Sequence, residues 1–124
     1  MNDPVAARLG LTRAMRLRHK GEFTRIREEG RRVSKGCLAA NWLVLPAGSL
    51  PRLGVITTRK LGKAHVRSRA RRLLRESFRL HQHELRNPVA LVLVARNSIV
   101  GRRLSEVEAD FLALLRGVSL LSHQ

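Results

Sequence analysis

The chain has 124 residues, the size of one domain, and 44% of them are hydrophobic, which is enough for a folded core. Its formal net charge is +16, and a bound polyanion would relieve the repulsion among these charges, so nucleic acid or an acidic membrane surface is indicated as the partner. No apolar run approaches the ~20 residues of a membrane-spanning helix. The single cysteine, Cys37, excludes an internal disulfide and a zinc site built from cysteines.

The N-terminal residues show no steady periodicity, and we expect residues 1–15 to be flexible. They lack the charged-then-apolar order of a secretory signal. They are rich in arginine, as transit peptides are, but this bias continues along the whole chain, which argues against a transit peptide. Because the chain has one cysteine and no internal disulfide, we expect a reducing, cytoplasmic compartment. One domain is expected over residues 16–119, followed by a tail of residues 120–124.

A short helix is predicted by the stretch HKGEFTRIREEG, because Phe23 and Ile26 are three residues apart and Gly30 follows as a stop. Two apolar runs then flank a turn rich in Pro, Gly and Ser at 46–51, which predicts a hairpin of strands 37–45 and 53–57.

The second half of the chain predicts two helices around one strand. A basic helix is expected over about 64–85, and VALVLVA (89–95) is a short, β-branched, fully apolar run typical of a central strand. The stretch LSEVEADFLALLRG has helical apolar spacing, with Ser105 as the expected N-cap. The predicted order is therefore α-β-β-α-β-α, a small single-domain α+β fold in which helices cover one sheet as an α/β sandwich.

Positive charge is concentrated in the basic helix and the loop before it, which read KLGKAHVRSRARRLLRESFR from residue 60. Nine of the 21 residues at 59–79 are Lys or Arg, and Glu76 is the only acid among them. Projection at about 100° per residue separates an arginine face from an apolar face formed by Val66, Ala70, Leu73, Leu74, Ser77, Phe78 and His81. A solvated face normally mixes charges of both signs. A face of one sign indicates contact with phosphates, which arginine binds in a bidentate manner.

Residues that could carry out chemistry are few. Between Glu29 and Glu106 the only acids are Glu76 and Glu84, too few for a carboxylate cluster that holds catalytic metal ions. His81 and His83 lack other obvious ligands, so we expect no metal and no catalytic residue on the protein. If the protein belongs to an enzyme, another molecule carries the reaction. Tyrosine is absent and aromatic residues make up 3%, which argues against a sheet that binds RNA mainly by aromatic stacking.

The stretch RLGVITTRKLGKAHVRSRARRLLRESFR resembles the signature of the bacterial ribonuclease P protein subunit. That signature combines a basic loop, an Arg-Asn-Arg triplet that opens a helix, and further arginines one turn on. RLRHKGEFTRIREEG resembles the N-terminal pattern of the family, and VALVLVAR with a closing helix matches its later order, so the resemblance covers about residues 13–116. Ser68 stands where the triplet has Asn, and Arg27 and Asn41 stand where the family often has aromatic residues.

The resemblance implies a sheet of about four strands with a left-handed βαβ crossover, against the usual hand. It also implies that a large RNA subunit removes the 5′ leader of precursor tRNA with Mg²⁺ held by that RNA, and that the protein is a monomer within the ribonucleoprotein. The implied contacts to the RNA subunit are Arg59, Lys60, Lys63, Arg67, Ser68, Arg69, Arg71, Arg72 and Arg75. The implied contacts to the leader are Arg16, Phe23, Arg25, Arg27 and Asn41.

Three other functions fit a basic helix. A ribosomal-type RNA-binding protein would share the helix but need neither a leader site nor processing activity. A DNA-binding protein usually has a short partner helix and turn before its reading helix, whereas a strand precedes the loop here. A helix that binds acidic membrane would need the apolar face that the core is expected to bury.

Overall fold

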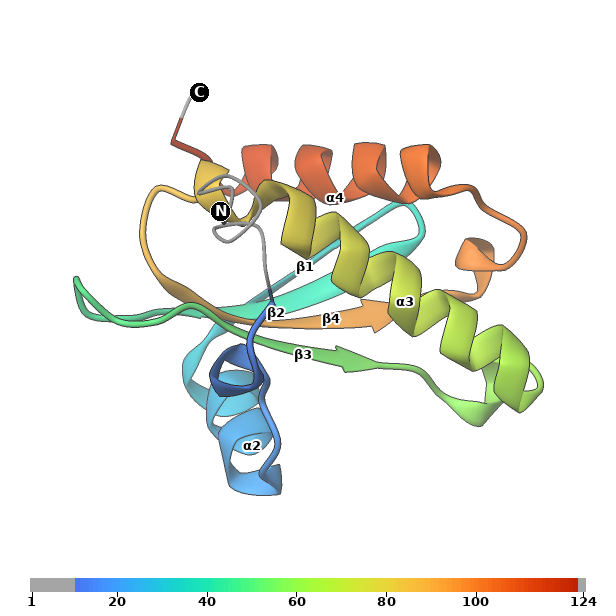
Figure 1. The fold of residues 1–124 in the computed structure, drawn as a ribbon, viewed down its shortest axis with the longest axis horizontal. Helices are drawn as coiled ribbons and strands as arrows, with labels where there is room; N and C mark the ends of the chain where they lie inside the picture. Colours follow the sequence, from blue (N-terminus) through green and yellow to red (C-terminus); the bar gives the residue numbers. More distant parts are fainter. Residues whose placement is uncertain (1–10, 123–124) are drawn as a thin grey trace, which may run out of the picture.

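The computed structural model describes residues 11–122, and in this part of the chain helices lie on both faces of a four-stranded sheet (Figure 1). The α-helices and strands are, in chain order, α2 (Lys20–Glu29), β1 (Arg31–Lys35), β2 (Leu38–Val44), β3 (Arg52–Ile56), α3 (Ala64–His81), β4 (Val89–Ala95) and α4 (Leu104–Gly117). Short 3-10 turns lie at Arg13–Met15 (η1), Arg59–Leu61 (η2), Gln82–Glu84 (η3) and Asn97–Ile99 (η4). The α+β class and the four-stranded sheet are confirmed, but the predicted order lacked β1.

The sheet order is β1-β2-β4-β3, which shows that the predicted hairpin of β2 and β3 was wrong. β4 lies between these two strands, antiparallel to β2 and parallel to β3. The reason is the composition of β4: Leu91 and Leu93 are buried on one face, and Ala90 and Val92 on the other. A strand that is apolar on both faces is most stable at the centre of a sheet covered on both sides.

β2 pairs on its other side with β1, which is an edge strand of the sheet. The sequence did not reveal β1, because Val33 is the only apolar residue of this strand. Polar and charged side chains suit an edge strand, because they discourage pairing with another chain. The turn between β1 and β2 contains Gly36 at φ +57°, and the Cys37 amide donates a hydrogen bond of 2.9 Å to the Asp110 carboxylate of α4. A Cβ atom at residue 36 would lie 2.1 Å from that carboxylate, so glycine is required there.

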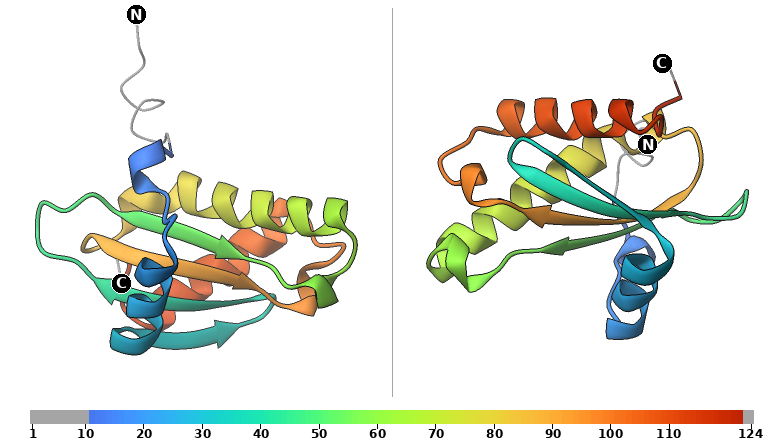
Figure 2. Two further views of the ribbon diagram at one scale, coloured as in Figure 1. Left: turned by 90° about the horizontal axis from the view of Figure 1, so that it is seen from below. Right: turned by 180° about the vertical axis from the view of Figure 1, so that it is seen from behind.

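The β3–α3–β4 crossover is left-handed. In the left view of Figure 2 both strands point the same way with β3 above β4, and α3 lies on the far side of the sheet. Turned so that the helix faces the viewer and the strands point up, β4 lies to the left of β3. The rare hand implied by the resemblance is therefore present.

The two faces of the sheet are covered unequally. α3 and α4 lie together on one face, and α2 crosses the other (Figure 1). The main core lies under α3 and α4 and contains the fully buried Phe78 and Phe111. Trp42 is 6% exposed and belongs to this core, which removes it from the opposite face.

Several helix and chain ends differ from the prediction. α3 ends at His81 and a 3-10 turn follows, so the helix is shorter than 64–85. α4 begins one residue before Ser105, and the N-cap is Arg103, whose amide donates to Glu106 Oε1 at 2.9 Å.

The described segments before α2 and after α4 are partly packed. Met15, at the end of the segment expected to be flexible, is 4% exposed in the core, and residues 1–10 lie outside the described residues. Leu120 and Leu121 of the expected tail are also buried. Within residues 11–122, none of the helices has the length and apolar character needed to cross a membrane.

Candidate nucleic-acid interface

The division of α3 into two faces is confirmed at its centre. Ala70, Leu73, Leu74, Ser77 and Phe78 are buried against the sheet and α4. The one hydroxyl among them is satisfied, because Ser77 Oγ donates to the Leu73 carbonyl at 2.9 Å. Burial of this face stabilises the helix, so the arginines on the other face are held outward despite their mutual repulsion.

A hollow of about 480 Å³, here called the arginine groove, runs along the outer face of α3. It is lined by Leu11, Arg16, Ser68, Arg71, Arg72, Arg75, Glu76 and Arg79. Burial, and then the charges of Arg16 and Arg71, lower the pKa of Arg75 from its usual value. The neighbouring cations add to the effect of burial, and a bound anion would relieve their repulsion.

Two arginines of the groove are held in place by hydrogen bonds to neighbouring side chains. Arg71 Nη1 donates to Thr57 Oγ1 at 2.7 Å, and Arg71 Nη2 donates to Ser68 Oγ at 3.2 Å. Ser68, which stands in place of the family's Asn, therefore orients a neighbouring guanidinium. Arg79 donates from Nε to both Glu76 oxygens at 3.1 Å, so part of its charge is already neutralised.

The N-terminal end of α3 carries positive charge where the helix dipole disfavours it. No acidic side chain lies in the first turn, and Lys63 is the N-cap. The 3-10 turn before it holds exposed Arg59 and Lys60, and buried Leu61 anchors this turn. Unpaired helix amides together with nearby cations favour a phosphate at this end.

The opposite face of the sheet is left open beyond α2. In the left view of Figure 2, α2 crosses one end of the sheet and leaves the ends of β3 and β4 uncovered. We call this region the open sheet face. It contains Ile56, which is 37% exposed, and half-buried Val94.

Phe23 of α2 borders the open sheet face and packs directly on β3. A Cβ atom on Gly54 would lie 2.5 Å from Phe23 Cε1, so only glycine admits the ring at this position. Arg27 lies one turn further on the same side of α2 and is exposed.

Asn41 and Arg32 occupy the same face, at the β1 edge. Asn41 is 7% exposed, and its Oδ1 accepts a hydrogen bond of 3.2 Å from Arg32 Nη1. Arg32 was missed by the sequence reasoning because β1 was not recognised as a strand. Recognition of β1 would have placed Arg32 opposite Asn41 and so identified Arg32 as a candidate.

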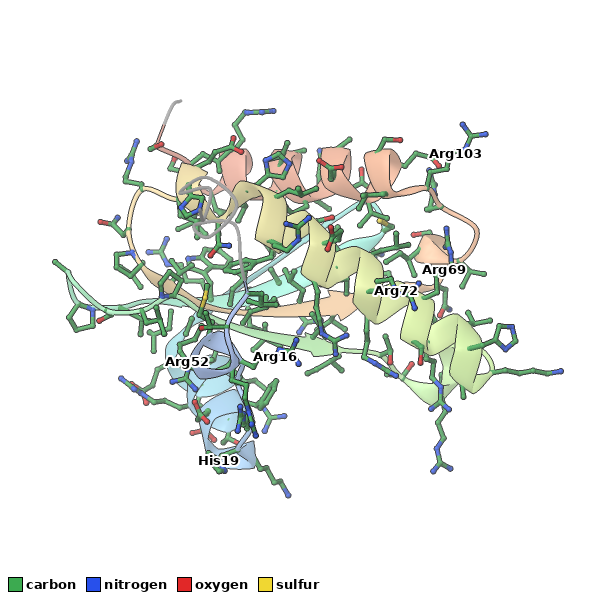
Figure 3. All side chains as sticks on the ribbon, in the orientation of Figure 1. Arg16, His19, Arg52, Arg69, Arg72 and Arg103 are labelled. Atoms are coloured by element: carbon green, nitrogen blue, oxygen red, sulfur yellow. The ribbon has the colours of Figure 1, made fainter. Side chains whose placement is uncertain are left out.

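The five predicted leader contacts do not all come together. Phe23, Arg27 and Asn41 lie toward the open sheet face, whereas Arg25 lies on the other side of α2 and pairs with Glu29 at 3.3 Å. Arg16 lies at the outer edge of β3. It lines the arginine groove and also a smaller hollow of about 100 Å³ with Phe23, Gly54 and Arg75. Arg16 therefore links the two predicted surfaces (Figure 3).

Among residues 11–122 no group of three or more His, Cys, Asp or Glu side chains is placed to hold a metal ion. His81 contacts Glu84 through Nδ1 and Glu108 through Nε2, the latter at 2.8 Å, and so joins the end of α3 to α4. Burial, together with hydrogen bonding to Asp110, raises the pKa of the Cys37 thiol to about 12, so the thiol stays protonated.

The fold, the arginine groove and the basic end of α3 define a class, the small α+β proteins that bind a polyanion. The family model for Ribonuclease P matches residues 11–119. The ribonuclease P protein component of Desulfovibrio desulfuricans is 40% identical over 111 residues, which are 86% of this chain and 84% of that protein. The chain therefore belongs to the Ribonuclease P protein family, whose members bind RNA in tRNA processing.

Solved structures show the same fold. The RNase P protein of Staphylococcus aureus superposes with a TM-score of 0.79 at 21% identity, covering 89% of this chain and all of that one (100%). The RNase P protein of Thermotoga maritima gives a TM-score of 0.71 at 26% identity, covering 82% of this chain and 96% of that one.

Proposed function

We propose that the protein is the RNA-binding subunit of a bacterial ribonuclease P, and that it promotes removal of the 5′ leader from precursor tRNA. The observation that carries this proposal is the arginine groove, where Arg75 lies among other cations along one helix. The cations of such a site repel one another, and a bound polyanion stabilises the site by reducing this repulsion. Because the chain belongs to the Ribonuclease P protein family, we take this polyanion to be ribonuclease P RNA.

In this proposal the RNA subunit contacts the exposed side of α3 and the loop before it. Arg71, Arg72 and Arg75 bind phosphates along the groove, and Arg59, Lys60 and Lys63 bind at the end of the helix. Arg67, Ser68 and Arg69 form the first turns between these two groups. Arginine suits this role because its planar fork matches two phosphate oxygens.

The single-stranded leader is assigned to the open sheet face. Phe23 offers a ring edge next to Gly54, Arg27 offers an exposed cation on α2, and Arg32 offers one on the β1 edge. With Trp42 in the core, contacts to phosphates and polar groups take over from aromatic stacking.

The hydrolysis itself is assigned to the RNA subunit, with Mg²⁺ held by that RNA. The protein contributes binding energy and position rather than catalytic side chains. We assign it to the cytoplasm, as one protein copy in each ribonucleoprotein.

The test is cleavage of a 5′-extended precursor tRNA at low Mg²⁺ by a bacterial ribonuclease P RNA alone, the protein alone, and both together. Cleavage only with both is the expected result. Tight RNA binding without stimulation would replace the proposal with a ribosomal-type RNA-binding role. Cleavage by the protein alone would contradict the assignment of the chemistry to RNA.

A further inference from the structure

A second hollow lies on the side of α3 away from the arginine groove, between the first half of the helix and the loop that connects β4 to α4. We call it the loop pocket. It measures about 200 Å³, below the ~300–1,000 Å³ typical of sites for drug-sized ligands. It is lined by His65, Val66, Arg69, Ala70, Ile99, Val100 and Gly101.

The loop pocket has an apolar floor and a cationic rim. Only His65 and Arg69 among its lining residues carry polar side chains, and none of them is acidic. Val100 is 50% exposed at the mouth, although Ile99 beside it is 1% exposed in the core.

Arg69 holds the wall of the loop pocket in place. Its Nη2 donates a hydrogen bond of 2.8 Å to the Arg102 carbonyl, which ties the loop to α3. Figure 3 shows Arg69 on the side of α3 that faces this loop, with Arg103 beyond it. Gly101 has φ +82°, a conformation that glycine favours, and it turns the chain at the mouth. The pocket is thus preformed rather than created by side-chain movement.

We propose that the loop pocket binds one unpaired nucleobase of the RNA subunit. This inference rests on the proposed function, and it adds a contact to a base where the arginine groove provides contacts to phosphates. RNA-binding proteins take bases out of single-stranded loops and place them against apolar or guanidinium surfaces. The phosphates on either side of the base would lie near Arg69 and Arg103.

The charge around the loop pocket selects this occupant over an apolar protein segment. Arg69 belongs both to the basic helix and to the wall of the pocket, and a phosphate chain is the partner that complements its charge. Glu106 pairs with Arg102 at 3.4 Å, and no ion pair within residues 11–122 involves the side chain of Arg69 or Arg103. An apolar peptide would leave these charges uncompensated.

The experiment measures binding of a bacterial ribonuclease P RNA to the full-length protein and to Val100→Asp. Ser98→Asp is the matched control, because it adds the same charge to the same loop outside the lining of the pocket. Val44→Asp tests the substitution at a valine of similar exposure, 52%, on the other end of the sheet. Thermal unfolding checks that each variant is folded.

We expect Val100→Asp to weaken RNA binding about tenfold, the scale of losing one bound base, and both controls to change it much less. In the same assay, an abasic substitution at one unpaired nucleotide of the RNA should weaken binding to the wild-type protein and have no further effect with Val100→Asp. Equal losses of affinity for Val100→Asp and Ser98→Asp would overturn the base-binding pocket but leave the proposed function standing. The same conclusion would follow if no abasic substitution weakened binding to the wild type without further effect in Val100→Asp. No binding of the RNA by the wild-type protein would overturn the proposed function with it.

Discussion

Asn41 holds the guanidinium of Arg32 at the edge of the open sheet face. Asn41 Oδ1 accepts from Arg32 Nη1 at 3.2 Å, and Asn41 Nδ2 donates to the Arg31 carbonyl at 3.4 Å. Both ends of the amide are therefore used within the β1–β2 pair. Arg32 has five N–H donors, and this bond occupies one of them. In the proposed function Asn41 is therefore a positioning residue for Arg32, whereas the resemblance implied a direct contact between Asn41 and the leader.

The first prediction concerns this pair. Arg32→Ala should weaken binding of a long-leader precursor tRNA to the ribonucleoprotein by about fivefold, the equivalent of roughly 1 kcal/mol for a hydrogen bond. Asn41→Ala should have a smaller effect because Arg32 keeps its charge but loses its orientation. The double variant should lose little more than Arg32→Ala, since both residues act through one contact. The measurement is the Kd of each holoenzyme for the precursor.

A precursor with a single-nucleotide leader is the substrate control, and its affinity should not change in any variant. Arg25→Ala is the protein control, because Arg25 lies on the other side of α2 and pairs with Glu29. Additive losses for Arg32→Ala and Asn41→Ala would mean that Asn41 has a contact of its own.

The second prediction compares two arginines of the groove. Arg72 is exposed, and Arg79 pairs with Glu76. Arg72→Ala should lower the slope of log K against log salt for RNA-subunit binding by about one, the value for one phosphate contact. Arg79→Ala should lower it less, since Glu76 already compensates its charge. Equal slopes for the two variants would refute the view that the groove binds phosphates through its unpaired arginines.

The sequence predicted the two faces of α3 better than the connections of the sheet. Charge and period in α3 were enough to separate Leu74 from Arg72, because a helix face follows from local spacing alone. The pairing of β2 with β4 depends on which strand is buried on both faces, and this is decided only when all strands compete for neighbours. A hairpin between consecutive strands is the simplest prediction, but β4 gains more burial in the centre.

The contacts on the open sheet face show a second limit. Phe23 could be identified from the pattern of its helix. Its contact with Gly54 could not be predicted, because the two residues belong to separate elements. Arg32 was missed because a mostly polar edge strand has a weak apolar period. Arg25 entered the leader set together with Phe23 through the resemblance, although residues two apart on a helix differ by about 200° in direction.

The third prediction concerns the pH dependence of stability through His81. Burial disfavours the charged ring, but hydrogen bonds with the Glu84 and Glu108 carboxylates outweigh this and raise the pKa of His81 above its usual value. Its side chain is 17% exposed, and the two carboxylates approach it from η3 and α4. Because the folded protein binds this proton more tightly than the unfolded chain, stability from the charged ring is complete below the unfolded pKa of about 6.5. It is lost as the pH rises through the higher pKa of the folded state.

The measurement is the Tm of the wild-type protein and His81→Gln across pH 5 to 9. We expect the wild type to exceed the variant by several degrees at the acidic end, on the scale of roughly 1–2 kcal/mol for a charge-assisted hydrogen bond. The difference should shrink toward the alkaline end. His83→Gln, two residues away and exposed, should show no such trend. A constant difference between wild type and His81→Gln would mean that His81 stabilises the α3–α4 contact as a neutral ring, and that its bonds to Glu84 and Glu108 carry no ionic contribution.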